Sequence, residues 1–531
     1  MRGSSAEAGL EAREADAEGV MGVPGSHGSP IRGGGATAYG IALVSGAALT
    51  LAFPEPDLAP VAWVAVAPLF VLVRGATPGL GFRLGAVYGV AFFGTLLFWQ
   101  SLLGWIAWGL LVGLEAVFMG LWGGLWAVAS RRGGRLAGVL VPAALWVAME
   151  YLRSVVPFGG FPWGHLAQSQ HDLVWMLRPA AFTGAWGVSL LAAMANGALA
   201  EAWRSLTSII PRSAAGAAAL VAAAVGLVAA PVLLPSQSAG GREARVAIVQ
   251  GNVPRDYAGS FFDKELEVIE SQARLTAGLR KGNPDLVIWP ESSVGIDPYR
   301  YPEVRRALAE AARAVGAPML VGGEVDVGSQ KRKVVVLRVT PKGRIRGFYQ
   351  KRHHVPFGEY IPARRFLDWI PMLDQVPTDS IPGPGPEVFM LAGGPVAPVI
   401  SFEGDFGSLV RQSIDAGGRL LVVATNTSTF GFTWNSAQHV AFSQLRAAEN
   451  GVWVVHAALS GISAFIAPDG AVVQSTPLWQ AVTAVQRVRF STGATFYART
   501  GDWLPLGCAV AGLGAVLFGA VARKDPDAQR S

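Results

Sequence analysis

The sequence predicts an α/β protein with two parts: a multi-span α-helical membrane domain and one large domain in which strands alternate with helices. Just over half of the residues are hydrophobic and only 15% are charged, whereas an ordinary soluble protein carries about a quarter charged residues. From about residue 243 the long apolar runs give way to short β-branched runs that alternate with amphipathic stretches. This alternation is typical of an α/β domain with a covered sheet.

The first 36 residues predict a disordered cytoplasmic tail. They are rich in Gly, Ala, Ser and Glu and contain no long apolar run. A secretory signal needs a basic start followed at once by an apolar core, and this segment has neither. Met21 is an alternative start of the chain.

Apolar runs then predict a membrane domain over residues 37–234, with about seven transmembrane helices, and a final transmembrane helix at 502–522. A spanning helix needs about 20 mostly apolar residues. The predicted spans are 37–53, 58–73, 84–100, 104–129, 136–156, 182–203, 214–234 and 502–522. The first two are short and contain or adjoin prolines, so their limits stay open.

Arginine and lysine residues predict the orientation of these helices, because cytoplasmic loops carry the excess of basic residues. If the tail is cytoplasmic, the inner loops carry Arg74, Arg83, Arg131, Arg132, Arg135, Arg204, Arg212, Arg523, Lys524 and Arg530. The outer loops carry only Arg153 and Arg178, both around the segment 157–181, which its aromatic and polar residues mark as an interfacial or re-entrant loop. Both termini are therefore expected inside and residues 235–501 outside. Buried helices of a large soluble protein would not explain this alternation.

The large domain is expected to contain buried strands separated by helices. The predicted strands are 245–250, 285–289, 318–322, 333–339, 344–349, 396–400, 419–424 and 452–456. The predicted helices are 263–280, 302–315 and 436–449. Ligand sites in such sheets form at the carboxyl ends of the strands.

Several kinds of partner are not expected. The net charge of +6 is spread along the chain rather than gathered on one face, so nucleic acid is not an expected partner. Cys508 is the one cysteine, which excludes an intramolecular disulfide and a cysteine-rich metal site. His353, His354 and His439 have no further ligands beside them, and no glycine-rich phosphate loop is present. We therefore expect no metal and no cofactor.

Three polar residues follow predicted strands and form the candidate catalytic set: Glu291, Lys351 and Ser401. Brought together, a carboxylate, an ammonium and a hydroxyl would supply a base, an oxyanion-stabilising cation and a nucleophile. Each has a structural alternative. Glu291 could cap a helix or pair with a surface arginine, and the basic run that begins at Lys351 could contact anionic headgroups.

The sequence around these residues resembles the apolipoprotein N-acyltransferase family over its whole length from the first span to the last. The segments that carry the resemblance are W-P-E (289–291), K-x-H-x-V-P-F-G-E-Y-I-P (351–362), S-F-E-G-D-F-G-x-L-V-R (401–411), T-N-x-x-T-F-G (425–431), Q-H (438–439) and G-I-S-A-F-I-A-P-D-G (461–470). Some of these forms look most like actinobacterial members. The resemblance implies that residues 243–491 form a nitrilase-like (carbon-nitrogen hydrolase) α-β-β-α sandwich on the outer face of the cytoplasmic membrane.

The family's activity is N-acyl transfer from a phospholipid to the α-amino group of the diacylglyceryl-cysteine at a lipoprotein N-terminus. By resemblance, Glu291 is the general base, Lys351 stabilises the oxyanion, and Glu359 positions the lysine or assists proton transfer. The family's nucleophile is a cysteine, and Ser401 stands in its place. A serine hydroxyl is a weak nucleophile unless a base takes its proton. Cys508 lies in the last apolar run and cannot substitute.

Two alternatives follow from this departure. The protein could be a catalytically silent relative that binds lipid or lipoprotein, or anchors a partner such as a polyprenol-phosphate mannose synthase, an enzyme with which some actinobacterial relatives are associated. It could also be a nitrilase-type amidase with another substrate, although the eight predicted spans argue against that.

Overall fold

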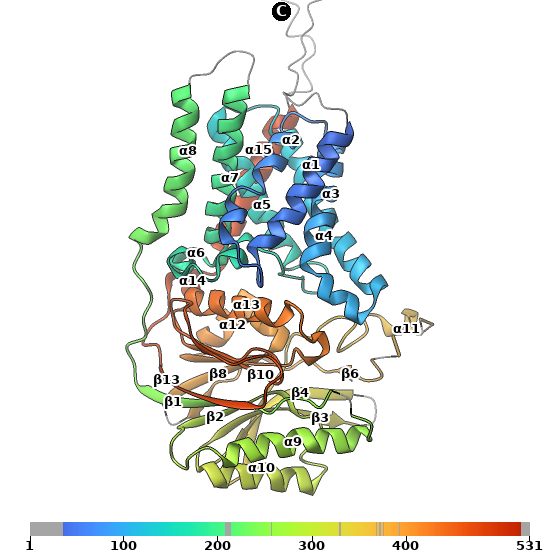
Figure 1. Cartoon of the computed structure of the whole chain (residues 1–531), viewed down its shortest axis with the longest axis vertical. Helices are drawn as coiled ribbons and strands as arrows, with labels where there is room; N and C mark the ends of the chain where they lie inside the picture. The colour runs from blue at the N-terminus through green and yellow to red at the C-terminus, as the bar shows by residue number, and fades with distance from the viewer. Residues whose placement is uncertain are drawn as a thin grey trace, which may run out of the picture.

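The computed structural model describes residues 35–207, 214–255, 257–328, 331–367, 369–370, 373–374, 376–391 and 393–521. Almost all of the predicted N-terminal tail, together with Arg212 and the basic C-terminal end, lies outside these residues. A bundle of long helices stands on a domain of two stacked sheets (Figure 1). The predicted fold class, a membrane-type helical domain plus an α-β-β-α sandwich, is confirmed.

Among the described residues, six helical segments are long and apolar enough to cross a membrane. They are Gly35–Ala52, Pro78–Leu96, Trp105–Ala129, Arg135–Arg153, Ala214–Leu233 and Trp503–Val521. The helices of the bundle are α1 (Gly35–Leu49), α2 (Ala67–Val73), α3 (Pro78–Leu96), α4 (Trp105–Ala129), α5 (Arg135–Arg153), α7 (Ala185–Thr207), α8 (Ala214–Ala229) and α15 (Trp503–Val521). The last of these holds Cys508, which is buried.

Two predicted spans differ from the structure. The run 58–73 is a 3₁₀ turn (Ala59–Trp63) followed by the short α2, because each piece begins beside a proline that cannot continue a preceding helix. The helix α7 forms a pair with the segment Val174–Thr183, bent by 118°. The break falls at Gly184, whose φ of +68° favours glycine. Counted as one span, this pair brings the total to seven.

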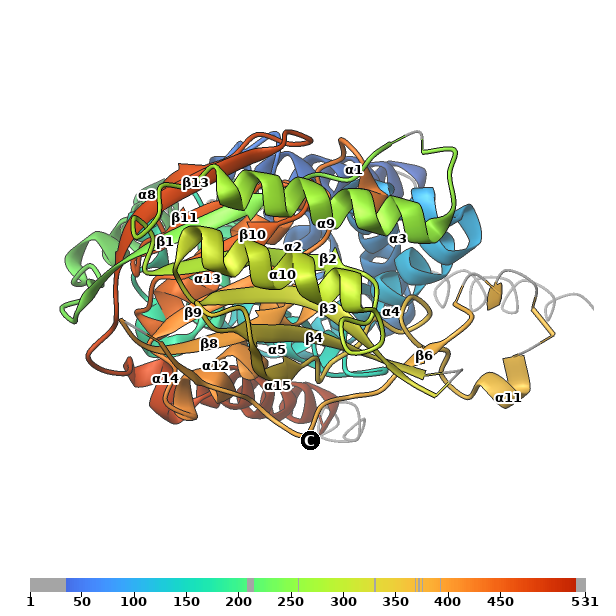
Figure 2. The ribbon, with the colours of Figure 1, turned by 90° about the horizontal axis from the view of Figure 1, so that it is seen from below.

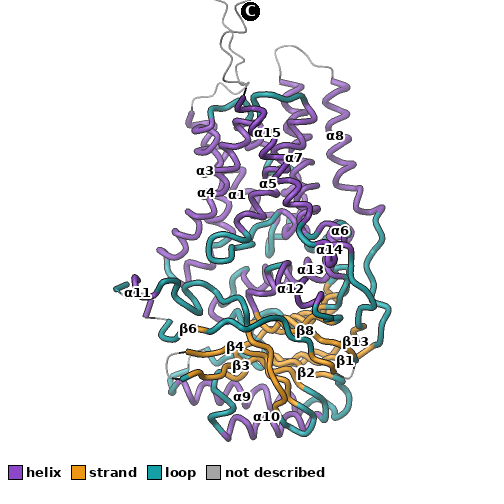
Figure 3. Tube along the Cα trace, turned by 180° about the vertical axis from the view of Figure 1, so that it is seen from behind, coloured by secondary structure: helices purple, strands orange, loops and turns teal. Residues whose placement is uncertain are grey.

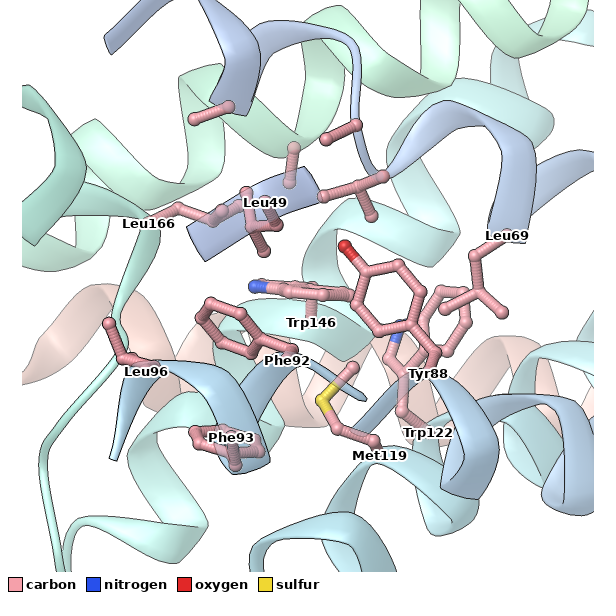
Figure 4. Packing of buried hydrophobic residues seen from close by; sticks show 14 of the residues in the cluster. Leu49, Leu69, Tyr88, Phe92, Phe93, Leu96, Met119, Trp122, Trp146 and Leu166 are labelled. Carbon is pink, nitrogen blue, oxygen red and sulfur yellow. The ribbon is translucent and has the colours of Figure 1, made fainter. Parts of the chain in front are cut away.

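Aromatic residues fill the core of the bundle (Figure 4). The ring of Trp122 stacks on Phe70 at 5.1 Å and meets the edge of Trp146 at 5.6 Å. Beside them, α3 and α4 approach closely, since a Cβ on Gly85 would lie 2.2 Å from a backbone oxygen of α4. Small residues at helix crossings are typical of membrane helix pairs.

Three basic residues lie at one end of the bundle. The end that faces the sheets includes the carbonyls of Pro54 and Leu96, both within 3.4 Å of Gln438 in the sandwich. At the opposite end, Gly75 donates its N–H to Ser130. Helix α3 runs from Pro78 to Leu96, beside the sandwich, and α4 runs back to Ala129 (Figures 1 and 3). The basic residues at 74, 131 and 132 therefore flank the helix ends remote from the sheets.

The sandwich contains two sheets. The first has the order β13-β1-β2-β3-β4-β5, with β6 beside β4, and the second has the order β12-β11-β10-β9-β8-β7. The strands of the first are β1 (Glu243–Gln250), β2 (Leu286–Val294), β3 (Met319–Val327), β4 (Lys331–Val339), β5 (Ile345–Gln350), β6 (Asp379–Ser380) and β13 (Val482–Arg489). The strands of the second are β7 (Phe389–Leu391), β8 (Gly394–Ile400), β9 (Leu420–Thr425), β10 (Val454–Ala458), β11 (Ala464–Ile466) and β12 (Val472–Ser475).

Helices cover both outer faces. Helices α9 (Phe261–Ala277) and α10 (Pro302–Val315) lie across the first sheet on the side away from the bundle (Figure 2). Helices α12 (Gly407–Asp415) and α13 (Asn435–Asn450) lie between the second sheet and the bundle (Figure 1). In β1, Val246 and Ile248 face the second sheet, while Ala247 and Val249 face α9 and α10. This period of two buries both faces of the strand.

Candidate active site

The structure brings together all four residues that the sequence singled out. Glu291 lies in β2, Lys351 directly follows β5, and Ser401 directly follows β8. Glu359 lies in the loop after Lys351. The two sheets thus each contribute to one site, at the carboxyl ends of the parallel strands β2 and β8.

Lys351 lies between two carboxylates. Its Nζ is 2.8 Å from Oε1 of Glu359 and 3.2 Å from Oε1 of Glu291. The side chains of Lys351, Glu291 and Glu359 are 1%, 9% and 15% exposed. Burial would lower the pKa of Lys351, but the charges of the two glutamates outweigh it and raise that pKa, so the side chain stays an ammonium.

The two carboxylates have different proton affinities. Burial raises the pKa of Glu291 above its ordinary value, although the charge of Lys351 opposes this. Burial would also raise the pKa of Glu359, but its attraction to Lys351 is stronger and holds the pKa below the ordinary value. Neighbouring carboxyl groups whose pKa values are pushed apart are typical of an acid-base site. Glu291 is therefore the group suited to accept and return a proton.

Ser401 is held in a conformation that suits a nucleophile. Its φ of +49° is in the left-handed region, which is uncommon for a non-glycine residue and recurs at active sites. The hydroxyl of Thr425 donates to Ser401 Oγ at 3.2 Å, and the Ser401 side chain lies near enough to Glu291 to lower the pKa of that carboxyl. The next backbone N–H, that of Asn426, donates to Glu291 Oε2 at 3.0 Å. The end of β9 thus fixes Ser401 and Glu291 relative to each other.

Glu403 is a further residue of the site that the sequence did not single out for a role. It is fully buried. Its Oε1 accepts the backbone N–H groups of Arg352 and His353, at 2.6 and 3.1 Å. Its Oε2 accepts the hydroxyl of Tyr349 at 2.7 Å and the N–H of Ile400 at 2.8 Å. One carboxylate thereby joins the turn that carries Lys351 to the turn that carries Ser401. Its only sequence signal is its place in S-F-E.

The loop that holds Glu359 is a compact turn. The N–H of Val355 donates to Glu359 Oε2 at 2.8 Å, and the N–H of Glu359 donates to the carbonyl of Val355 at 2.9 Å. Phe357, between them, has a φ of +62°. The motif V-P-F-G-E therefore folds back on itself and directs the second oxygen of Glu359 at the lysine.

The helical bundle contacts the site directly. Trp163, in the predicted interfacial loop, stacks on Phe402 with a 21° angle between the rings. Gln438 Oε1 accepts the indole N–H groups of Trp163 and Trp99, at 2.8 and 3.0 Å. Because Phe402 follows Ser401, the loop 157–181 packs on the turn that carries Ser401.

Two histidines near the junction of bundle and sandwich, His439 and His171, face carboxylates. His439 Nδ1 lies 3.1 Å from Asp405 in α13's packing against the Ser401 turn. One trio, His171 with Asp57 and Asp172, could by spacing hold a metal ion. However, His171 Nε2 faces Asp57 at 2.9 Å, and Nδ1 faces Asp172 and Gln444 at 3.1 and 2.8 Å. Since both ring nitrogens face acceptors, this ring fits a protonated donor rather than a ligand.

Comparisons with known proteins agree with this architecture. The apolipoprotein N-acyltransferase N-terminal domain matches residues 45–198, and the carbon-nitrogen hydrolase domain matches residues 245–496. The chain is thus a membrane-type helical protein with a carbon-nitrogen hydrolase domain. An apolipoprotein N-acyltransferase from Geobacter metallireducens is 32% identical over 92% of this chain and 96% of its own length. The chain belongs to the apolipoprotein N-acyltransferase family, as its motifs predicted.

Other relatives carry the same name. The apolipoprotein N-acyltransferase from Mycolicibacterium smegmatis is 33% identical over 90% of this chain and 84% of its own. That from Gloeobacter violaceus is 30% identical over 92% and 94%. Among solved structures, an amidase from Nesterenkonia sp. is 17% identical, covers 50% of this chain and 95% of its own, and has a TM-score of 0.35.

Proposed function

We propose that this protein transfers an acyl chain from a phospholipid to the α-amino group of the diacylglyceryl-cysteine at a lipoprotein N-terminus. The observation that supports this most directly is the connected arrangement of Ser401, Glu291 and Lys351 in a member of this family. A nucleophile, a base and a buried cation are the parts that acyl transfer through an acyl-enzyme requires.

In the first half-reaction, Ser401 attacks the ester carbonyl of the phospholipid. Glu291 takes the hydroxyl proton, and the ammonium of Lys351 stabilises the negative charge that develops on the carbonyl oxygen. Because Thr425 already donates to Ser401 Oγ, the serine proton is free to point at Glu291. Glu291 then gives the proton to the glycerol oxygen that leaves with the lysophospholipid.

In the second half-reaction, the lipoprotein amine attacks the acyl-serine. Glu291 takes a proton from the attacking nitrogen, the new amide bond forms as the ester bond breaks, and the proton returns to Ser401. The raised pKa of Glu291 suits this double use, because a group with a pKa closer to the working pH both accepts and donates readily.

The same proposal places the helices in the cytoplasmic membrane, with the sandwich on its extracytoplasmic face. Support comes from the basic residues 74, 131 and 132, which lie at the end of the bundle remote from the sheets. Basic residues favour the cytoplasmic side. Phospholipid and lipoprotein would then both reach the site from the outer leaflet.

A silent relative is the second candidate, because Ser401 stands where the family has a cysteine. In that case the acyl-enzyme would not form, and the protein would bind lipid or lipoprotein, or anchor a partner. A polyprenol-phosphate mannose synthase stays a predicted partner only for this alternative. The hydrogen bond from Thr425 to Ser401 Oγ and the nearness of Glu291 favour activity.

Intact-protein mass spectrometry separates the two candidates. Purified protein is incubated with phospholipid alone, then with a diacylglyceryl-cysteine peptide. We expect an added acyl mass on Ser401, its loss to the peptide, and no adduct in Ser401→Ala or Glu291→Gln. Ser408→Ala, in the adjacent α12, is the matched control. An adduct that forms only in Ser401→Cys would instead mean that the site is intact but inactive, because serine stands in place of the nucleophilic cysteine.

A further inference from the structure

Besides Glu291, Glu359 and Glu403, a fourth carboxylate belongs to this part of the protein. Glu324 lies level with Lys351 in the first sheet, on the other side of β4. Glu324 in β3 pairs directly with Val334 in β4. On the other side of β4, the carbonyl of Val334 accepts the N–H of Lys351 at 2.9 Å. Strands lie about 4.8 Å apart, so the backbones at Glu324 and Lys351 are about 10 Å apart across β4.

The side chains of this row point to the same side. Residues directly opposite each other in a ladder share a face. Val334 packs in the core between the two sheets, as does Leu320, four residues before Glu324. Since strand side chains alternate, Glu324 projects from β3 toward the space between the sheets, where Glu291 and Lys351 also lie.

Glu291 comes close to this part of β3. A Cβ on Gly322, two residues before Glu324 and on the same face, would lie 2.6 Å from the Cα of Glu291. Because Gly322 has no side chain, the backbone of β2 at Glu291 can pack directly against this face of β3. Glu324 is the next residue of β3 on that face, toward the carboxyl end of the strand.

Glu324 is also the most accessible carboxylate of the group, with a side chain that is 23% exposed, against 9% for Glu291. Its Oε2 accepts a hydrogen bond from the guanidinium of Arg332 at 3.2 Å. No donor among the described residues reaches Oε1. One oxygen is therefore held in place by the arginine, and the other is available to a ligand that enters from solvent.

The α-ammonium group of the lipoprotein acceptor has to lose two protons, and Glu291 alone cannot take both. A free α-amine has a pKa of about 7.7–8.0, so at neutral pH it is mostly an ammonium without a lone pair. Two protons must leave the nitrogen before the amide is formed. Glu291 takes the second and returns it to Ser401, and a different group has to take the first.

We propose that Glu324 binds the α-ammonium group of the lipoprotein acceptor and takes its first proton, so that the free amine attacks the acyl-serine. The step rests on the proposed function. The N–H bond of the ammonium breaks and a bond from Glu324 Oε1 to hydrogen forms. The proton then passes to solvent, to which Glu324 is partly open, while the amide bond forms and the serine ester bond breaks.

The charged groups around Glu324 suit this role. Burial raises its pKa to about 7, Arg332 on β4 opposes the rise, and the carboxylates of Glu265 on α9, Glu291 on β2 and Glu359 add to it. A base whose pKa is near that of the amine can take the proton and release it again.

The kinetic test uses Glu324→Gln in the full-length protein. Acyl-enzyme should form from phospholipid at the wild-type rate, because that half-reaction involves no amine. Transfer to a diacylglyceryl-cysteine peptide should fall about 100-fold at pH 7 and recover toward wild type at pH 9, where the free amine prevails. Asp326→Asn, on the same strand in a surface pair with Arg300, is the matched control and should change neither step.

A binding test judges the proposal even if no acyl-enzyme forms, which would be a failure of the proposed function alone. The wild-type protein should bind a diacylglyceryl-cysteine peptide with a free α-amine more tightly than the same peptide with an N-acetyl group. Glu324→Gln should bind the two equally. An equal loss of both half-reactions in Glu324→Gln, unchanged transfer, or an amine preference that survives the substitution would overturn the proposal.

Discussion

Glu359 is the closer partner of Lys351: their charged atoms are 2.8 Å apart, whereas Glu291 lies 3.2 Å from the same Nζ. The lysine is thus held mainly by the glutamate that stays ionised. Glu291, with its raised pKa, is the carboxyl group that we propose exchanges protons with Ser401.

Replacing Glu359 by Gln should slow acylation of Ser401. Among the described residues, Lys351 would then keep an ion pair with Glu291 alone, and the stronger attraction would lower the pKa of Glu291 and weaken it as a base. We expect acyl-enzyme formation to slow about 10- to 1000-fold, measured by rapid quench and mass spectrometry. The surface substitution Glu303→Gln on α10 should leave the rate unchanged. An unaltered rate in Glu359→Gln would mean that this carboxylate does not control the base.

Ser401→Cys should raise the rate of acyl-enzyme formation. A thiol has a reference pKa of about 8.5 and is a far better nucleophile than a hydroxyl. The added mass should map to residue 401. Because Cys508 offers a second thiol, the double variant Ser401→Cys with Cys508→Ser is the control and should behave like the single variant. A Ser401→Cys protein slower than wild type would show that the pocket is shaped for serine.

The stability of the bundle–sandwich junction should fall at alkaline pH. Burial would lower the pKa of His171, but its bonds to Asp172 and Asp57 outweigh that and raise the pKa to about 9. The unfolded value is about 6.5. The stabilisation is therefore complete below pH 6.5 and is lost as the pH rises through 9. Since both aspartates are partly exposed, the effect is about 1 kcal/mol.

The measurement is the melting temperature of wild type and His171→Gln at several pH values. We expect the two curves to converge between pH 7 and 10. Parallel curves would mean that His171 is not the titrating group at the junction.

Gln438→Leu should destabilise the contact between bundle and sandwich. It removes the acceptor of two buried indole N–H groups, those of Trp99 and Trp163. An unpaired buried donor costs about 1–3 kcal/mol, so the melting temperature should drop clearly and Trp163 should become less ordered over Phe402. Gln474→Leu, on the edge strand β12, is the control with little expected effect. A small change at Gln438 would indicate that water replaces the amide.

Sequence patterns predicted regular elements best where local chemistry marks both ends. The predicted helix 302–315 matches α10, which starts at Pro302 and ends before Gly316 in the left-handed conformation. The run 58–73 was predicted less well, because hydropathy does not register how prolines divide a span. Strand β13 was missed since Val482–Arg489 lies at a sheet edge, breaks the polar–apolar alternation of a strand in its middle, and carries no long buried run.

The candidate site shows the same limit. Glu291, Lys351 and Ser401 could be singled out because each follows an apolar strand within a recognisable motif. Thr425, Asn426 and Glu403 could not be assigned roles, since these depend on which turns meet in space. Glu403 joins segments about 50 residues apart, and no local pattern encodes that meeting.

The pairing of β1 with β13 also bears on how the protein is made. These strands run side by side from Glu243 opposite Arg489 to Gln250 opposite Val482. The first strand after α8 therefore cannot pair fully until the last strand before α15 has been made. Contacts between residues this distant in sequence form slowly, because a long loop must close first. During synthesis, the first sheet can be completed only once the chain through residue 489 has left the ribosome. A chain that stops earlier would leave the open edge of β1 available for pairing with other polypeptides.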